Sequence, residues 1–218
     1  MFNLDGSEGN MCGNAIRCVA KLLYDSGTVT DKHITIETKS GLRTIEVITQ
    51  EGQVSHAVVN MGKAIFDPKQ IPVQFEGSEM IAQPLEVDGK AYTVTCVSMG
   101  NPHAVVFTDL VDVIDIEKVG PEFEFDPVFP ERVNTEFVKI IDDHTIKMRV
   151  WERGSGETMA CGTGACAAAV AAVLNGYCPK NEDIRVILKG GTLVIRYTDD
   201  TVYMTGNCSK VFEGKMEI

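Results

Sequence analysis

The segment MACGTGACAAAVAAVLNG, residues 159–176, joins a cysteine and two glycines to a run of small apolar residues. Alanine has the highest helix propensity, and a glycine at position 176 suits the residue after a helix C-terminus. The pattern is apolar on every side, which predicts a buried helix beginning just after Cys161. Because its side chains are small, we expect strands to pack closely around it.

A second segment of the same kind lies earlier in the chain, NMCGNAIRCVAKLLYDSG, residues 10–27. When Cys12 is placed on Cys161, the glycines that close the two segments, Gly27 and Gly176, also coincide. The earlier helix carries charged residues and therefore has one solvent-exposed face.

The likeness continues downstream of both segments. ITIETKSGLRTIEV, residues 34–47, resembles IRVILKGGTLVIRY, residues 184–197, and each reads as two alternating strands around a turn. A further strand ending in glycine follows each, VVNMG at 58–62 and VYMTG at 202–206. Matches in the same order predict a duplicated α/β unit.

Further strands are expected between the two copies. The alternating runs are IPVQF (71–75), MIAQPLEV (80–87), AYTVTCVSM (91–99), HAVVFTD (103–109), NTEFVKII (134–141) and TIKMRVWE (145–152), and DIEKVGPEFE (115–124) suits a short helix.

The predicted fold is α/β (α+β), with two pseudo-symmetric lobes. Each lobe is a largely antiparallel or mixed sheet wrapped around a central helix, and the active site lies in the cleft between the lobes. We expect residues 1–60 and about 207–218 in the first lobe, and residues 61–206 in the second.

Composition narrows the class of protein. Of the 218 residues 44% are hydrophobic and 23% are charged, which suits a globular protein. The net charge of −11 argues against a nucleic-acid partner. No apolar run reaches the ~20 residues that span a membrane. The first residues lack the pattern of a signal peptide, so we expect a cytoplasmic protein with reduced thiols.

Two cysteines at helix starts suggest proton transfer. A helix N-terminus offers free N–H groups to an anion and lowers the pKa of a thiol. If the copies face each other, Cys12 and Cys161 lie on opposite sides of a small carboxylate ligand. One thiolate can then remove the proton next to the carboxylate while the other thiol returns one to the opposite face. We expect no cofactor, because no cofactor-binding motif is present.

Other interpretations of the cysteines fit less well. A zinc site favours short C-x₂₋₄-C spacings with partner ligands, but on a helix Cys12 and Cys18, like Cys161 and Cys166, lie well apart in angle, so no metal is expected. A structural disulfide is disfavoured in a reducing compartment. A single cysteine nucleophile working with His103 leaves the second Cys-Gly pair unexplained. The remaining cysteines are interpreted as packing residues: Cys18, Cys96, Cys166, Cys178 and Cys208.

The sequence resembles the diaminopimelate epimerase family. The resemblance rests on four motifs in family order, FNLDGSEGNMCGNAIRC (2–18), MGNPHAVVF (99–107), ERVNTEF (131–137) and WERGSGETMACGTGACA (151–167). The CGTG motif also occurs in proline racemases, but those relatives carry histidine where Asn14 stands. The resemblance implies a cofactor-independent isomerase of lysine and peptidoglycan precursor synthesis that inverts LL-diaminopimelate to the meso form.

The resemblance also implies roles for individual residues. Cys12 and Cys161 are the acid/base pair. The helix-start residues that hold the α-carboxylate are Gly13, Asn14, Gly162 and Thr163. The residues that bind the distal end of the substrate are Asn3, Asn101, Asn134 and Arg153. Glu152 and His103 lie beside the cysteines, and Glu152 is also available to the α-ammonium.

Each of these residues also has a plain structural interpretation. Asn101 and His103 could form a turn with Pro102, and Glu152 with Arg153 could be a solvated pair. Asn3 could be a loop residue, and Asn134 could bond backbone groups at a strand edge.

Against the family pattern, the first copy is short at its N-terminal side. We therefore expect an incomplete first lobe. Two alternatives remain open, another cofactor-independent amino-acid racemase of the proline racemase kind, or an inactive truncated relative. The resemblance implies a homodimer with an amino-acid substrate.

Overall fold

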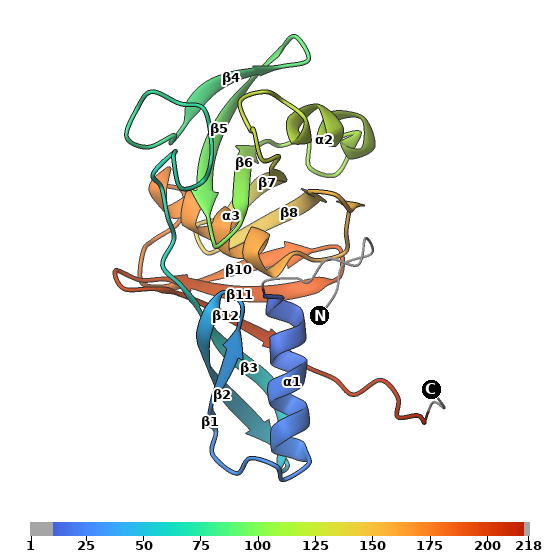
Figure 1. The fold of residues 1–218 in the computed structure, drawn as a ribbon. Coiled ribbons are helices and arrows are strands. Elements are labelled where there is room, and N and C mark those ends of the chain that lie inside the picture. Colours follow the sequence, from blue (N-terminus) through green and yellow to red (C-terminus); the bar gives the residue numbers. More distant parts are fainter. Residues whose placement is uncertain (1–10, 216–218) are drawn as a thin grey trace. The chain divides into compact units, whose positions relative to one another are not determined.

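The computed structural model describes residues 11–215 (Figure 1). The fold is mixed α/β, with three helices and twelve strands in this range. The chain forms two compact units, of which the first contains residues 11–59 and 205–215 and the second residues 60–204.

The first unit contains one helix and an antiparallel meander. Alternate strand residues such as Ile45 and Val47 are buried, as the period of two along a strand requires. Ile16 and Ala20 form the buried face of the helix, whereas Val19 is 42% exposed. The elements are α1 (Gly13–Asp25), β1 (His33–Thr38), β2 (Gly41–Gln50) and β3 (Gln53–Gly62).

The second unit is a mixed sheet around a central helix. Its strands are β4 (Gln83–Val87), β5 (Lys90–Ser98), β6 (Pro102–Phe107), β7 (Asn134–Asp142), β8 (Thr145–Glu152), β9 (Gly156–Glu157), β10 (Asp183–Leu188), β11 (Gly191–Tyr197) and the start of β12 (Val202–Asn207). The strand order is β11-β10-β8-β7-β6-β5-β4, and β9 pairs with β8. β8 with β10 and β6 with β7 are parallel, and the other pairs in this series are antiparallel.

Helix α3 (Gly162–Leu174) is the centre of the second unit. It contacts β5, β6, β7, β8, β10 and β11, and Figure 1 shows it lying against these strands. Every residue from Gly164 to Ala172 is buried, because the run of alanines offers no side chain that needs water. The prediction of a buried helix enclosed by strands is confirmed.

The two copies predicted from the sequence have matching local structure. Helices α1 and α3 are each 13 residues long, and Gly27 and Gly176 follow them with φ of 73° and 75°. The hairpins after them have the same register at the turn, Thr38 opposite Gly41 and Leu188 opposite Gly191. The shared order of helix, hairpin and third strand confirms the internal duplication.

Most expectations for the segment between the copies are confirmed. Strands β4 to β8 overlap five of the six alternating runs, and α2 (Ile116–Glu124) falls within the expected short helix. The prediction of a strand at 71–75 is wrong. Ile71 and Val73 are buried in irregular structure, where the N–H of Val73 bonds to Pro68 and that of Gln74 bonds to Val128. The apolar residues of this segment alternate because they are buried, although the segment pairs with no strand of the described structure.

Candidate functional site

Cys12 and Cys161 occupy the same position in their respective helices. Each is the N-cap residue, with φ −126° and ψ 116° for Cys12 and φ −114° and ψ 114° for Cys161. The sulfur of Cys12 accepts a hydrogen bond from the Ala15 N–H at 3.5 Å, and that of Cys161 accepts one from the Gly164 N–H at 3.3 Å. The prediction that both cysteines begin a helix is confirmed.

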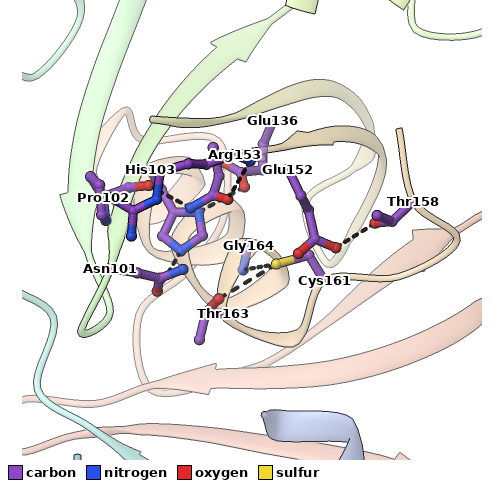
Figure 2. Close-up of polar contacts among 11 residues, drawn as sticks. Asn101, Pro102, His103, Glu136, Glu152, Arg153, Thr158, Cys161, Thr163 and Gly164 are labelled. Carbon is purple, nitrogen blue, oxygen red and sulfur yellow. Dashed lines mark hydrogen bonds and ion pairs between the residues drawn. The ribbon is translucent and has the colours of Figure 1, made fainter. Parts of the chain in front are cut away.

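The surroundings of Cys161 are closely packed, and Figure 2 shows the polar groups near it. The thiol residue is 6% exposed, and its sulfur lies 3.4 Å from the Thr163 hydroxyl oxygen. A Cβ atom added to Gly164 would lie 2.5 Å from Glu136 Oε1 and 3.3 Å from the Cys161 sulfur. The buried carboxyl of Glu136 therefore lies against the first turn of α3, next to the thiol.

The pKa of Cys161 is raised above its ordinary value. Burial of the thiol is the main cause, and the negative charges of Glu152 and Glu136 add to it. Contacts with Thr163 and the Gly164 N–H act in the opposite direction but do not offset burial. The expectation that the helix start lowers the pKa of this thiol is therefore wrong, and Cys161 is a protonated thiol at neutral pH.

His103 lies at the centre of a hydrogen-bond network on strands β6 and β7. Its side chain is fully buried, with Nδ1 2.7 Å from Glu136 Oε1 and Nε2 3.0 Å from Asn101 Oδ1 (Figure 2). His103 faces Asn134 across the parallel strand pair, which places Glu136 two residues further along the same face.

Asn134 connects this network to the end of β8. Its Nδ2 donates to the Pro102 carbonyl oxygen at 2.8 Å, and its Oδ1 accepts from the Arg153 backbone N–H at 3.0 Å. Asn134 is 4% exposed, so these bonds satisfy a buried carboxamide. The plain structural role considered for Asn134, bonding of backbone groups, is observed.

Glu152 is the last residue of strand β8, and Arg153 is the first residue after it. Glu152 accepts a hydrogen bond from the Thr158 hydroxyl, and Arg153 Nη1 donates to the Glu131 carbonyl oxygen at 2.9 Å. Arg153 is exposed, and a guanidinium has further N–H groups that can bind a carboxylate.

The second unit brings most of the expected site residues together. Around Cys161 and His103 lie Asn101, Asn134, Glu152, Arg153, Gly162 and Thr163. In the first unit, Gly13 and Asn14 follow Cys12 at the start of α1. Asn3 lies outside the described residues.

Two polar residues near the site were missed from the sequence. Arg17 binds the helix start in the first unit, with Nη2 3.1 Å from Asn14 Oδ1 and Nη1 3.1 Å from the Gly13 carbonyl oxygen. Glu136 was also missed, although it lies in the quoted ERVNTEF motif. The sequence signal that could have identified Glu136 is a carboxylate within an apolar strand, two residues after Asn134. A carboxylate at such a position is buried and therefore needs a polar partner.

Replacement of Glu152 by glutamine tests the electrostatics at Cys161. Because the negative charge of Glu152 raises the pKa of this thiol, Glu152→Gln lowers that pKa, and the thiolate forms at lower pH. We expect alkylation of Cys161 at mildly alkaline pH to become several-fold faster, on the order expected for one nearby charge. The measurement is iodoacetamide labelling against pH with peptide mass spectrometry.

Glu157→Gln is the matched control for this experiment. The Glu157 carboxylate pairs with Arg149 and Lys189 and is not among the groups that act on Cys161. Labelling of Cys161 that changes equally in both variants would show that the effect is structural.

No helix in residues 11–215 is both long and apolar enough to cross a membrane. The same range contains no cluster of three or more histidine, cysteine, aspartate or glutamate side chains suited to a metal ion.

Solved structures with a similar fold include an epimerase and a probable racemase. A hydroxyproline epimerase from Agrobacterium vitis aligns over 94% of this chain and 65% of its own, with TM-score 0.69 and 13% identity. A probable proline racemase from Agrobacterium radiobacter aligns over 94% of this chain and 67% of its own, with TM-score 0.69 and 16% identity. The chain therefore has the fold of these epimerase and racemase structures.

Sequence comparison identifies the family within that class. The family model of diaminopimelate epimerase matches residues 1–66 and 95–211. The diaminopimelate epimerase of Acetivibrio thermocellus is 49% identical over 220 residues, covering all of this chain and 78% of the relative. That of Desulfovibrio desulfuricans is 49% identical over 226 residues, with the same coverage. The chain belongs to the diaminopimelate epimerase family.

Proposed function

We propose that this chain inverts the α-carbon of LL-diaminopimelate to give the meso form, a step in the synthesis of lysine and peptidoglycan precursors. One observation carries the proposal. In a chain of the diaminopimelate epimerase family, Cys12 and Cys161 begin two helices of equal length with the same cap geometry. Each helix start offers free N–H groups beside a thiol, which suits a carboxylate next to an exchanging proton.

The raised pKa of Cys161 distinguishes the roles of the two thiols in the proposed reaction. Because the pKa of Cys161 is raised, the proposal gives Cys161 the role of proton donor, which leaves Cys12 as the base. The Cys12 thiolate takes the α-proton, and the Cys161 thiol gives its proton to the opposite face of the α-carbon. The reaction leaves Cys12 as thiol and Cys161 as thiolate, and catalysis of the reverse reaction starts from that state.

The proposal assigns binding roles to the remaining residues. The α-carboxylate binds at the helix starts, Glu152 binds the α-ammonium, and Asn101, Asn134 and Arg153 bind the distal end. The proposal keeps the division into two lobes, residues 1–60 with 207–218 and residues 61–206, and each lobe supplies one of the two cysteines. The proposed reaction uses no cofactor and takes place in the cytoplasm. We propose that the protein is a homodimer, and light scattering on the purified protein tests this oligomeric state.

Exchange of the substrate α-hydrogen with heavy water tests the proposed activity. The expected result is deuterium incorporation and interconversion of the LL and meso isomers of diaminopimelate, with no exchange of proline or hydroxyproline. Exchange of proline instead of diaminopimelate would assign the chain to another racemase class. Absence of exchange with every amino acid would contradict the proposal.

Replacement of Arg153 by lysine tests the distal carboxylate site. A planar guanidinium can hold a carboxylate through two parallel hydrogen bonds, and an ammonium cannot. We expect Arg153→Lys to raise KM for diaminopimelate about 10-fold or more, the effect of losing one charged hydrogen bond, with a smaller change in kcat.

Arg196→Lys is the control for this substitution. Arg196 is half-exposed on β11, where Nε pairs with Asp183 at 2.7 Å. Its replacement should leave KM unchanged. An unchanged KM in Arg153→Lys would remove Arg153 from the binding site.

A further inference from the structure

Glu136 is a buried carboxyl for which the proposed reaction has no role. It is the third residue of β7 and is fully buried. Its Oε1 is bonded to His103, and its Oε2 has no hydrogen-bond partner in the described structure. Burial of a carboxyl with one unbonded oxygen is costly, so its retention calls for a functional reason.

Glu136 is the first member of a chain of three bonded side chains (Figure 2). Oε1 of Glu136 and Nδ1 of His103 share one proton at 2.7 Å. On the other side of the ring, Nε2–H donates to Asn101 Oδ1 at 3.0 Å. An amide oxygen only accepts, so this bond fixes the carboxamide of Asn101 with its donor group Nδ2 turned away from the ring.

We infer that Glu136 is a positioning residue, which acts through the protonation of His103 to orient the Asn101 carboxamide toward the substrate. The inference rests on the proposed function, in which Asn101 binds the distal end of diaminopimelate. With Glu136 in place, Nδ1 is occupied, Nε2 carries a proton, and Asn101 presents its N–H groups to a carboxylate.

Several titratable groups surround the Glu136 carboxyl. Burial raises the pKa of Glu136, and the charge of Glu152 adds to this, while His103 acts in the opposite direction. The titratable groups around the Glu136 carboxyl are His103 on β6, Cys96 on β5, Glu152 on β8 and Cys161 at the start of α3. Within these surroundings one proton lies between Glu136 Oε1 and His103 Nδ1.

Glutamine at position 136 breaks this arrangement with little change in shape. Gln can offer either its oxygen or its NH₂ group to Nδ1, so both neutral forms of His103 become populated. In one of them Nε2 has no proton, and Asn101 must turn its own NH₂ group toward the ring. Its oxygen then faces the substrate carboxylate, and binding weakens.

The test combines Glu136→Gln with Asn101→Ala in a double-mutant cycle. We expect Glu136→Gln to raise KM about 10-fold, the cost of one hydrogen bond to a charged group, with kcat changed less. In the Asn101→Ala background Glu136→Gln should add nothing to KM. Additive effects on KM would overturn the inference, because they would show that Glu136 acts independently of Asn101.

Thr135→Val is the matched control for a buried polar position on the same strand. Thr135 is fully buried, and its hydroxyl oxygen has no hydrogen-bond partner in the described structure. Its replacement removes a polar atom next to Glu136 without touching His103. KM should stay at the wild-type value, and an equal rise in KM for Thr135→Val would mean that any disturbance of β7 is sufficient.

The protonation of His103 provides a readout that needs no activity. In protein labelled with nitrogen-15 histidine, the inference requires a protonated Nε2 in the wild type and a mixture of neutral forms in Glu136→Gln. An unprotonated Nε2 in the wild type would overturn it without any variant. Lack of α-hydrogen exchange in the wild type, with His103 protonated as expected, would instead contradict the proposed function alone.

Discussion

Cys161→Ala should reduce the interconversion of LL- and meso-diaminopimelate at least ~10²-fold, the typical contribution of one general acid or base. The variant removes the thiol that, with its raised pKa, holds the proton to be delivered. Cys12→Ala should cause a loss of the same order, because the proposed reaction needs one thiol on each face of the α-carbon. The measurement is chiral chromatography of the product combined with deuterium incorporation.

Two other cysteines in the same helices serve as controls for these variants. Cys18→Ala changes an exposed thiol in α1, and Cys166→Ala changes a buried thiol in α3. Neither residue caps a helix, so both variants should keep turnover near the wild-type value. Wild-type turnover in Cys12→Ala or Cys161→Ala would end the two-thiol proposal, and a loss in Cys166→Ala would indicate that packing of α3 is responsible.

The sequence predicted the helix starts because their causes are local. Alanine propensity, the closing glycines and the repeated Cys-Gly step act over a few residues, and both N-caps were recovered. The buried state of α3 also followed from composition, since a helix without polar side chains has no face suited to water.

The electrostatics of the site could not be predicted in the same way. The pKa of Cys161 depends on burial by strands that are distant in sequence and on Glu136 and Glu152, which β7 and β8 bring near the thiol. The local rule for a helix N-terminus gave the wrong direction, because burial outweighs the contacts of the thiol with Gly164 and Thr163.

The sequence named candidate residues for the site but not the contacts between them. The pairing of His103 with Glu136 follows from the parallel register of β6 and β7, and no sequence pattern specifies that register. Residues 71–75 show the opposite case. Apolar and polar residues alternate there as in a strand, but the segment has no strand partner among the described residues and is irregular.

Gly164 illustrates how such a connection constrains the sequence. The equivalent position after Cys12 is Ala15, whose N–H bonds to the Cys12 sulfur as that of Gly164 bonds to the Cys161 sulfur. The cap geometry therefore accepts a Cβ atom. Glycine is required at position 164 because the Glu136 carboxyl occupies the space where that atom would lie.

Gly164→Ala should consequently lower kcat about 10²-fold, the scale of a displacement near 1 Å at a reacting group. Its Cβ atom would lie 2.5 Å from Glu136 Oε1 and 3.3 Å from the Cys161 sulfur. Glu136 cannot turn aside cheaply, because it is buried and bonded to His103. Overpacking costs about 1–3 kcal/mol, which exceeds the gain of up to about 1 kcal/mol for alanine over glycine in a helix.

Stability and turnover together decide whether this clash is the cause. Urea unfolding should show a lower free energy of unfolding for Gly164→Ala, and Gly164→Ala with Glu136→Asp should recover part of it, because the shorter carboxyl withdraws from the new methyl group. Ala15→Gly, the reciprocal change in the first copy, should lose about 1 kcal/mol of stability through helix propensity alone and keep its turnover. Wild-type turnover and stability in Gly164→Ala would contradict this prediction. They would show that the close contact between Glu136 and α3 does not constrain the Cys161 thiol, and that packing at this contact is not the cause of its raised pKa.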